Sequence, residues 1–305
     1  LSAHAGNQDF IDLAELLQPG LLADAELAQP IAESRQQLLA IAAQRFYEGH
    51  ATGRKGLDLA GFEAFRARND YWLDDFCLFC AIREVQESPG WLQWPEHLRD
   101  REPAALQAFV DQNQARLARV RFEQFLFNHQ WQALRDYARS RNVLLFGDIP
   151  IFVAQDSADV WANRQFFKLD ARGEPTVVAG VPPDYFSEEG QHWGNPLYNW
   201  QVMAEDGYQW WLQRLESQRH LFDLIRIDHF RGLQAYWEIP AEAPQPRNGY
   251  WVPGPSDHFL QACFDRFPDL PLVAENLGII SDDVEELRHR FRLPGMTVMQ
   301  FGFDG

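Results

Sequence analysis

The chain has 305 residues, of which 46% are hydrophobic and 23% are charged, which is the composition of a globular protein with a sizeable core. Lysine and arginine total 27 against 44 aspartates and glutamates, and the resulting net charge of −17 disfavours nucleic acid and anionic membrane surfaces as partners. Three cysteines, the lack of any apolar run near the roughly 20 residues of a membrane span, and the lack of a signal-peptide pattern predict a soluble, cytoplasmic protein.

A helical subdomain is predicted over residues 23–141, after an opening segment at residues 1–22. Within it, apolar residues recur at steps of three, four or seven, as the buried face of a helix requires. We predict one long helix at its end, with Pro103 in the first turn and Asn142 as the stop signal.

Cys77 and Cys80 have the spacing of a zinc or redox motif, but their surroundings favour a simpler interpretation. A zinc site needs a second pair of ligands, and none follows at a suitable distance. Residues 71–84 instead have helical periodicity, which places both cysteines on an apolar helix, where we expect buried, unreactive thiols. The nine histidines are scattered without ligand spacing, so no metal site and no other cofactor are predicted.

After residue 142 the sequence changes to short aliphatic runs separated by long loops. Four runs lack clean alternation and are predicted as parallel strands buried on both faces, at residues 143–146, 224–227, 272–274 and 298–301. An amphipathic helix with Ser281 as its N-cap is predicted between the last two, which completes a βαβ unit. Such units form either a doubly wound sheet or a closed barrel, and no glycine-rich phosphate loop favours a nucleotide site.

Acidic residues recur just past the expected strand ends, at Asp148, Asp228 and Glu275. A βα-barrel gathers its active site at the carboxyl ends of its strands, each strand contributing a group. The sequence therefore predicts an α/β fold of the (β/α)8 barrel type over residues 142–305. About four of the eight strands are recognisable, so we expect an incomplete barrel, with residues 1–22 associated with it and the helical subdomain as an insertion.

Two carboxylates that project into one cleft suit the chemistry of a glycosidic bond. Arg226 lies two residues before Asp228 on the same strand, where its guanidinium would keep this carboxylate ionised as a nucleophile. Partial burial beside an aliphatic run would raise the pKa of Glu275 toward that of a general acid. Either acid alone could instead cap a helix or form an ion pair, but equivalent positions on nearby strands favour a function.

The tryptophans also favour a sugar ligand, because indole rings stack on the apolar faces of sugars. Seven of the eleven fall between residues 148 and 256, namely Trp161, Trp193, Trp200, Trp210, Trp211, Trp237 and Trp251. Trp210 and Trp211 lie on a helix-like stretch and are expected in the core. Residues 179–196 are too rich in glycine and proline for a helix or a central strand, and we predict a long, ordered, functional loop there.

The sequence resembles the amylomaltases, which are also called 4-α-glucanotransferases or disproportionating enzymes and belong to the α-amylase-like clan of retaining barrel enzymes. The resemblance extends from SAHAGNQDFIDL to the last residue and is carried by GDIPIFVAQDSADVW, AGVPPDYFSEEGQHWGNPLYNW, LIRIDHFRG and LVAENLG, in this order. It implies transfer of α-1,4-glucan segments between maltooligosaccharides or starch by double displacement. The implied partners are a glucan donor and a glucan acceptor.

The resemblance also assigns roles to individual residues. It implies Asp228 as the nucleophile, Glu275 as the acid/base and Arg226 as the residue that holds the nucleophile. The implied substrate contacts are Asp148, Trp193, Asn195 and His229, together with Tyr185 and Phe186 on a lid loop that keeps water from the intermediate.

The family has two features that are missing here, a third carboxylate in a His-Asp-Asn motif on a later strand and a glucan-binding segment ahead of SAHAGN. We therefore expect the 305 residues to be an internal portion of the enzyme with little or no activity alone. A related α-glucan hydrolase or phosphorylase, and a non-catalytic glucan-binding protein, remain open as alternatives. Retaining chemistry predicts that the carboxyl groups of Asp228 and Glu275 lie about 5 to 5.5 Å apart.

Overall fold

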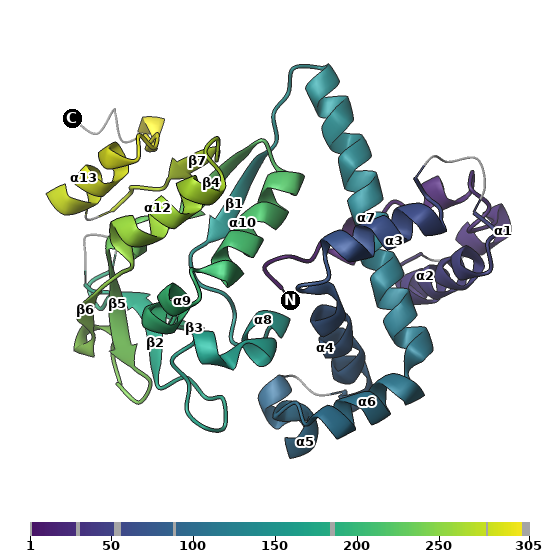
Figure 1. The fold of residues 1–305 in the computed structure, drawn as a ribbon, viewed down its shortest axis with the longest axis horizontal. Helices are drawn as coiled ribbons and strands as arrows, with labels where there is room; N and C mark the ends of the chain where they lie inside the picture. Colours follow the sequence, from purple (N-terminus) through teal and green to yellow (C-terminus); the bar gives the residue numbers. More distant parts are fainter. Residues whose placement is uncertain are drawn as a thin grey trace. The chain divides into compact units, whose positions relative to one another are not determined.

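The fold is divided into two compact units, Ser2–Arg141 and Asn142–Gly305, in a computed structural model (Figure 1). The structure describes residues 2–28, 31–51, 56–87, 90–183, 187–278 and 280–300. None of the helices in these ranges combines the length and the apolar character needed to cross a bilayer. Each unit is described by itself.

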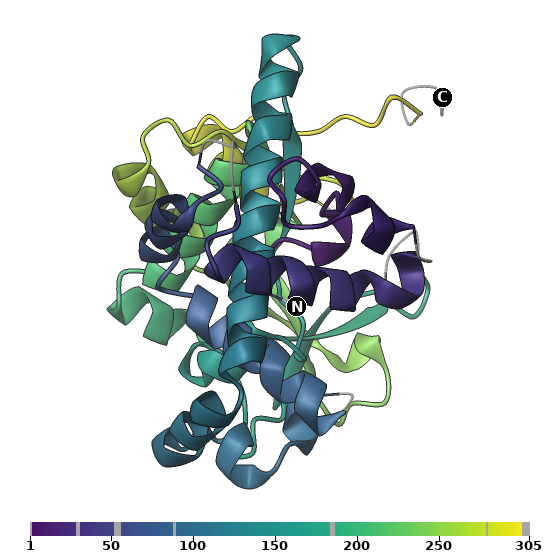
Figure 2. The same ribbon diagram turned by 90° about the vertical axis from the view of Figure 1, so that its right-hand side faces the viewer.

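The first unit is built from helices around the long helix α7, which α2 crosses (Figure 2). Its helices are α1 (Asp24–Leu27), α2 (Ile31–Tyr47), α3 (Leu59–Arg68), α4 (Leu73–Gln86), α5 (Glu96–Arg99), α6 (Pro103–Gln112) and α7 (Gln114–Ser140), with 3₁₀ turns at Gln8–Phe10, Ala14–Leu16 and Trp91–Gln93. Aromatic rings join them: Phe46 lies 5.0 Å from Phe122 between ring centroids, and Phe62 lies 5.5 Å from Phe125. The core of this unit is therefore a cluster of phenylalanines from α2, α3 and α7.

The predicted single helix over residues 103–142 is wrong, because the chain breaks at Asn113 into α6 and α7. The side-chain amide of Asn113 donates to the carbonyl of Phe109 at 2.9 Å, a local bond of the kind that competes with helix continuation. Leu134 belongs to the apolar pattern that predicts the buried face of this helix, but its side chain is 50% exposed. The stop at Asn142 is confirmed, since this residue adopts a left-handed conformation, φ 58°, two residues after α7 ends.

The two cysteines of the CxxC spacing lie on α4 as predicted. Cys77 is buried, and burial raises the pKa of both thiols, that of Cys80 to about 12. The predicted burial is confirmed for Cys77, while Cys80 is half-buried. Thiols with raised pKa are poor nucleophiles at neutral pH, which supports the prediction that this pair is unreactive.

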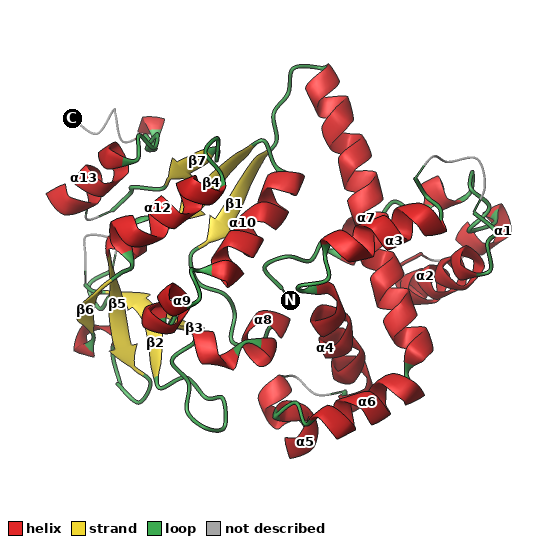
Figure 3. Ribbon diagram, viewed as in Figure 1, coloured by secondary structure: helices red, strands yellow, loops and turns green. Residues whose placement is uncertain are grey.

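The second unit contains two sheets, drawn in yellow in Figure 3. The parallel sheet has the strand order β1-β4-β7, with β1 at Phe146–Pro150, β4 at Leu224–Asp228 and β7 at Leu272–Ala274. The antiparallel sheet has the order β3-β2-β5-β6, with β2 at Val177–Val181, β3 at Gln191–Pro196, β5 at Ala235–Pro240 and β6 at Tyr250–Pro253. Helices α8 (Ala158–Ala162), α9 (Trp200–Glu205), α10 (Gln209–Leu221), α11 (Arg231–Gln234), α12 (Ser256–Arg266) and α13 (Asp282–Arg290), with 3₁₀ turns at Arg164–Phe166 and Pro246–Asn248, complete the unit.

The parallel strands only partly match the prediction. The strands at 224–227 and 272–274 and the helix after Ser281 are confirmed, although the Ser281 side chain makes no capping bond. The first strand begins at Phe146 instead of residue 143, because the Leu145 N–H donates to the Asp223 carboxylate and not to a strand. Residues 298–300 form no strand, and Met299 is 72% exposed, unlike a buried strand residue; residue 301 lies outside the described part. The sequence predicts about four strands in this sheet, and the described residues contain three.

The predicted loop over residues 179–196 is wrong at both ends, where β2 and β3 pair as an antiparallel hairpin. Gly180 is required there, because a Cβ would lie 2.2 Å from the Gln191 carbonyl oxygen. Pro196 is tolerated because β3 is an edge strand. Trp210 and Trp211 are 5% and 0% exposed, which confirms their placement in the core.

Candidate active site

Arg226 joins two predicted site residues, Asp148 and Asp228, across the parallel sheet. In the β1–β4 register Asp148 lies opposite Arg226, and Asp228 follows two residues later on the same face of β4. Arg226 Nε and Nη2 donate to the two carboxylate oxygens of Asp148 at 2.8 and 2.9 Å, and Nη2 also donates to Asp228 Oδ1 at 2.6 Å. The guanidinium is 23% exposed and the two carboxylates are 53% and 43% exposed, so all three side chains remain open to a ligand.

The surroundings of Asp228 have opposite effects on its pKa. Burial and the neighbouring Asp148 carboxylate raise the pKa of Asp228, the Arg226 guanidinium lowers it, and the net result is a raised pKa. Arg226 favours the ionised form of Asp228, as predicted, but the prediction leaves out burial and Asp148, which together make the net pKa of Asp228 higher than usual. The hydrogen bonds to Asp148 raise the pKa of Arg226, which stays charged.

Glu275 follows β7 directly and is 9% exposed. Its backbone N–H donates to the Ile227 carbonyl at 3.1 Å, which continues the β4–β7 pairing to the level of Asp228. Its two carboxylate oxygens accept backbone N–H groups, Oε2 from His229 at 2.9 Å and Oε1 from Leu277 at 2.7 Å. The structure therefore brings Asp228 and Glu275 to neighbouring strand ends and holds Glu275 through the main chain.

His229 lies between Asp228 and the antiparallel sheet in a left-handed conformation, φ 57°. Its ring meets the edge of Trp193 at 4.9 Å between centroids. Burial lowers the pKa of His229 to about 4, so the imidazole is neutral at pH 7. Its Nε2 is buried and has no hydrogen-bond partner within the described ranges, and a neutral imidazole there can exchange one hydrogen bond with a ligand.

Trp193 and Asn195 both lie on β3. Trp193 is 37% exposed, and its Nε1 donates to Gln191 Oε1 at 3.0 Å. Asn195 donates from Nδ2 to the Val153 carbonyl at 2.9 Å, which ties β3 to the segment after β1. The structure thus brings Trp193 to His229 and gives Asn195 a backbone partner. Tyr185 and Phe186 lie outside the described residues.

Gly232 is a neighbour of His229 that the sequence does not single out. A Cβ at this position would lie 2.9 Å from His229 Cδ2 and 2.9 Å from Ile151 Cδ1. No local pattern indicates this approach, because it depends on the turn that folds Gly232 back under the histidine, with its N–H donating to the His229 carbonyl at 2.8 Å.

Gly232→Ala is expected to destabilise the fold by roughly 1 to 3 kcal/mol, because the added methyl group overpacks the space under the His229 ring. Urea unfolding measures this cost. The same substitution in a His229→Ala background is the control and is expected to cost less. An equal cost in both backgrounds would show that the imidazole is not the group that clashes.

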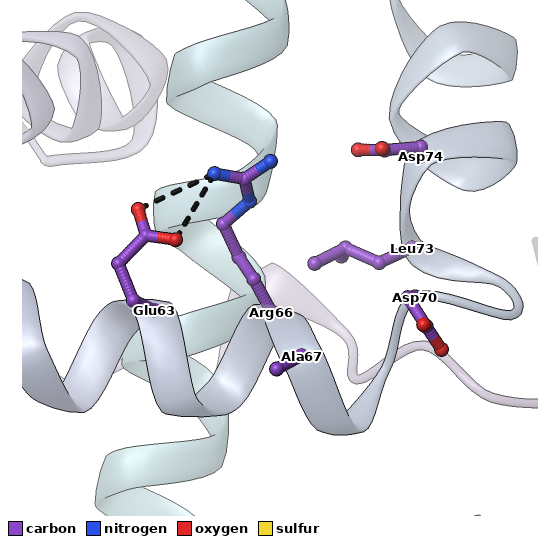
Figure 4. Close-up of a pocket in the computed structure, with 6 residues that line it drawn as sticks. All are labelled: Glu63, Arg66, Ala67, Asp70, Leu73 and Asp74. Carbon is purple, nitrogen blue, oxygen red and sulfur yellow. Dashed lines mark hydrogen bonds and ion pairs between the residues drawn. The ribbon is translucent and has the colours of Figure 1, made fainter.

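A shallow hollow of about 200 Å³ lies in the helical unit and contains no predicted site residue. Figure 4 shows its lining from α3, α4 and the turn between them: Glu63, Arg66, Ala67, Asp70, Leu73 and Asp74. Arg66 pairs with Glu63 at 3.3 Å, and Asp74 accepts from Arg121 at 2.7 Å. Over the described part of the chain, no group of three histidine, cysteine or acidic side chains is placed to hold a metal ion.

Two acids lie at neighbouring strand ends, one bound by an arginine and one by the main chain, and a pair of carboxylates is the arrangement that many enzymes acting on glycosidic bonds use. The chain belongs to the 4-alpha-glucanotransferase family, whose sequence model matches residues 1–305. It is 44% identical to a 4-alpha-glucanotransferase of Thermus thermophilus over 99% of this chain and 61% of that protein. Its identity to a 4-alpha-glucanotransferase of Synechocystis is 42%, over 99% of this chain and 62% of that protein.

Solved structures agree with this assignment. The amylomaltase from Streptococcus agalactiae in complex with acarbose superposes with a TM-score of 0.90 at 32% identity, over 99% of this chain and 62% of that one. The amylomaltase from Corynebacterium glutamicum shares the fold, with a TM-score of 0.71 at 21% identity, over 98% of this chain and 42% of that one. The chain spans about three-fifths of the length of the curated relatives named above.

Proposed function

We propose that the whole protein transfers α-1,4-glucan segments between maltooligosaccharides or starch chains by a retaining double displacement. The observation that carries the proposal is the joined set of charged side chains on the paired strands β1 and β4 and at the end of β7. Arg226 binds both Asp148 and Asp228, and Glu275 is fixed beside them by the His229 N–H. Family membership supplies the glucan as substrate class.

In the first step Asp228 attacks the anomeric carbon of the donor glucan, and the bond from this carbon to the glycosidic oxygen breaks. Glu275 gives its proton to that oxygen, so the leaving glucan departs with a new 4-hydroxyl group. In the second step the Glu275 carboxylate takes the proton of the acceptor 4-hydroxyl, whose oxygen attacks the same carbon and releases Asp228. Two inversions return the original configuration.

The remaining residues bind the sugar. Arg226 orients the Asp228 carboxylate and, with Asp148, meets the hydroxyl groups of the sugar at the cleaved bond. Trp193 lies along the same sugar, beside the unpartnered Nε2 of His229. Asn195 adds a substrate contact from β3. Tyr185 and Phe186, in the connection between β2 and β3, act as a lid that keeps water from the glucosyl ester.

The proposed fold of the whole protein is a (β/α)8 barrel to which β1, β4 and β7 belong. In this proposal residues 142–305 supply barrel strands, residues 1–22 associate with the barrel, and residues 23–141 are an inserted helical subdomain. The parallel pairing of three strands, with acids at two of their ends, supports it. The cytoplasm is the proposed compartment, supported by three free thiols and testable by fractionation.

We expect the 305-residue chain alone to release little or no glucose from maltotriose, whereas the protein at the full length of its relatives does so readily. The physical reason is that the proposed site lacks its third carboxylate in this stretch. Chromatography of the products measures both forms. Appreciable turnover by the 305-residue chain would contradict this expectation.

The same assay separates the proposed transferase from its alternatives. A transferase converts maltotriose into longer oligosaccharides as well as glucose. A hydrolase yields only smaller sugars, a phosphorylase needs phosphate, and a glucan-binding protein yields no product. Longer products without added phosphate therefore support the proposal, and any of the other three patterns contradicts it.

A further inference from the structure

Trp251 is a solvent-facing aromatic side chain that the proposed mechanism does not use. All eleven tryptophans lie in the described ranges, and the two most exposed are Trp193, at 37%, and Trp251, at 40%. Both contact the segment that directly follows Asp228. Trp193 meets the ring of His229, and the guanidinium carbon of Arg231 lies 4.0 Å above the Trp251 ring.

Trp251 lies within reach of the proposed active site. Arg231 comes three residues after Asp228, and three residues span at most about 10 Å of chain. The strand β6 that carries Trp251 is joined to α11 by a hydrogen bond from the Gly254 N–H to the Gln234 carbonyl at 2.8 Å. The indole is therefore attached to the same strand end as the proposed nucleophile.

The Trp251 ring has a rigid support. It packs against Trp237, directly opposite on β5, with ring centroids 5.2 Å apart and an interplanar angle of 72°. The indole of Trp237 is itself fixed, since Nε1 donates to the Pro246 carbonyl at 2.8 Å and the Gly249 backbone lies against its ring. A ring held in this way loses little conformational entropy when a ligand stacks on it.

Polar groups suited to sugar hydroxyls lie around Arg231, the residue in contact with the indole. Arg231 Nη1 donates to Ser281 Oγ at 3.2 Å, so the guanidinium joins the loop after β4 to the start of α13. Asp283 lies in the first turn of α13, and a hydrogen bond from Ser281 lowers the pKa of its carboxyl, which is ionised at pH 7. A guanidinium thus lies on the ring, and a hydroxyl and a carboxylate lie next to that guanidinium, which together offer the stacking and hydrogen bonding that a glucose unit requires.

We propose that Trp251 and Arg231 form a further glucose-binding subsite for an α-1,4-glucan chain, in which the part of the indole that Arg231 leaves exposed stacks on one sugar ring and Arg231 and Asp283 bind its hydroxyl groups. The subsite is separate from the sugar position at Trp193, and it rests on the proposed function for the identity of the ligand. A glucan long enough to reach both indoles binds more tightly than a short one. The chain-length preference of the protein is then set in part by Trp251.

The test compares the affinities for maltoheptaose and for maltotriose by isothermal titration calorimetry, in the Asp228→Asn background of the protein at the full length of its relatives, so that neither glucan is converted during the titration. Trp251→Ala is expected to weaken maltoheptaose binding by roughly five- to tenfold, the loss of one aromatic stacking contact, and to affect maltotriose less. Trp251→Phe keeps a ring and is expected to recover part of the affinity. Both variants are checked for folding by thermal unfolding.

Tyr137→Ala is the matched control. Tyr137 is 60% exposed and has the Arg141 guanidinium 5.3 Å from its ring centroid, but it lies on α7 in the helical unit. Its removal is expected to leave the affinity for both glucans unchanged. An equal loss in this control would mean that exposed aromatic rings bind glucan without selectivity, which contradicts the subsite.

The possible outcomes separate the subsite from the proposed function. Unchanged maltoheptaose affinity in a folded Trp251→Ala variant, together with a loss in Trp193→Ala, would overturn the subsite alone. Absence of glucan binding by the unsubstituted protein would overturn both. A selective loss for maltoheptaose with partial recovery by Trp251→Phe supports the subsite, even if transfer activity proves to belong to another reaction class.

Discussion

Asp228→Asn is expected to lower kcat for glucan transfer by at least about 10⁴-fold in the protein at the full length of its relatives. An amide oxygen cannot form the glucosyl ester that the proposed mechanism requires. The fold is expected to survive, because Arg226 keeps its two bonds to Asp148 and an asparagine oxygen can still accept the third. Disproportionation of maltotriose, followed by chromatography of the oligosaccharides, measures the effect.

Asp148→Asn is the matched control for this substitution, because it removes a charge from the same guanidinium without removing the proposed nucleophile. Misplacement of Arg226 is expected to cost about 10²-fold, far less than the loss of Asp228. Transfer activity that survives in Asp228→Asn would remove this residue from the nucleophile role. Equal losses in both variants would show that the reaction depends on the combined charge of Asp148, Arg226 and Asp228 and not on one carboxylate.

Glu275→Gln is expected to lower transfer from maltotriose by about 10² to 10⁴-fold, since the departing oxygen is no longer protonated. A donor whose leaving group needs no proton, α-glucosyl fluoride, is expected to react with Asp228 at a much smaller loss. Azide, which attacks without a general base, is then expected to restore turnover and form α-glucosyl azide. A fluoride electrode follows the release of the leaving group.

Thermal unfolding is measured beside this assay, because Glu275→Gln also carries a structural cost. Both carboxylate oxygens accept a backbone N–H, and a glutamine oxygen can satisfy only one of the two. A buried N–H without a partner is expected to cost about 1 to 3 kcal/mol of unfolding free energy. Recovery of activity with α-glucosyl fluoride and azide in a folded Glu275→Gln variant supports the acid/base role. An equal loss of activity on maltotriose and on α-glucosyl fluoride contradicts it. Asp228→Asn is expected to remain inactive with both donors.

Local sequence patterns predict the elements whose signals lie within one segment. The aliphatic runs of β4 and β7 and the charged first and last turns of α13 contain what is needed to recognise them. The β2–β3 hairpin was missed because its glycines and proline are individually unfavourable in strands. They are accommodated by a close backbone approach at Gly180 and by the edge position of Pro196, neither of which the sequence displays.

The contacts of the site likewise divide into those that a local sequence pattern predicts and those that depend on strand pairing. Arg226 and Asp228 are two residues apart on one strand, so their contact follows from strand geometry and is confirmed at 2.6 Å. The second contact of Arg226, with Asp148, depends on the register between β1 and β4. The bond from the His229 N–H to Glu275 depends on the pairing of β4 with β7. Such pairings join residues far apart in the chain, and no local pattern encodes them.

The hydrogen bond from the His229 N–H to the Glu275 carboxylate affects which substitutions the protein tolerates at residue 229. Because the donor is a peptide N–H, the side chain of residue 229 does not make the bond; the left-handed φ of 57° excludes proline, which also lacks the N–H, and disfavours β-branched residues. Substitution of the ring at residue 229 is therefore expected to alter the proposed sugar contact without releasing the carboxylate next to it. Directed evolution at this one codon can then change the proposed recognition while the proposed acid/base stays in place.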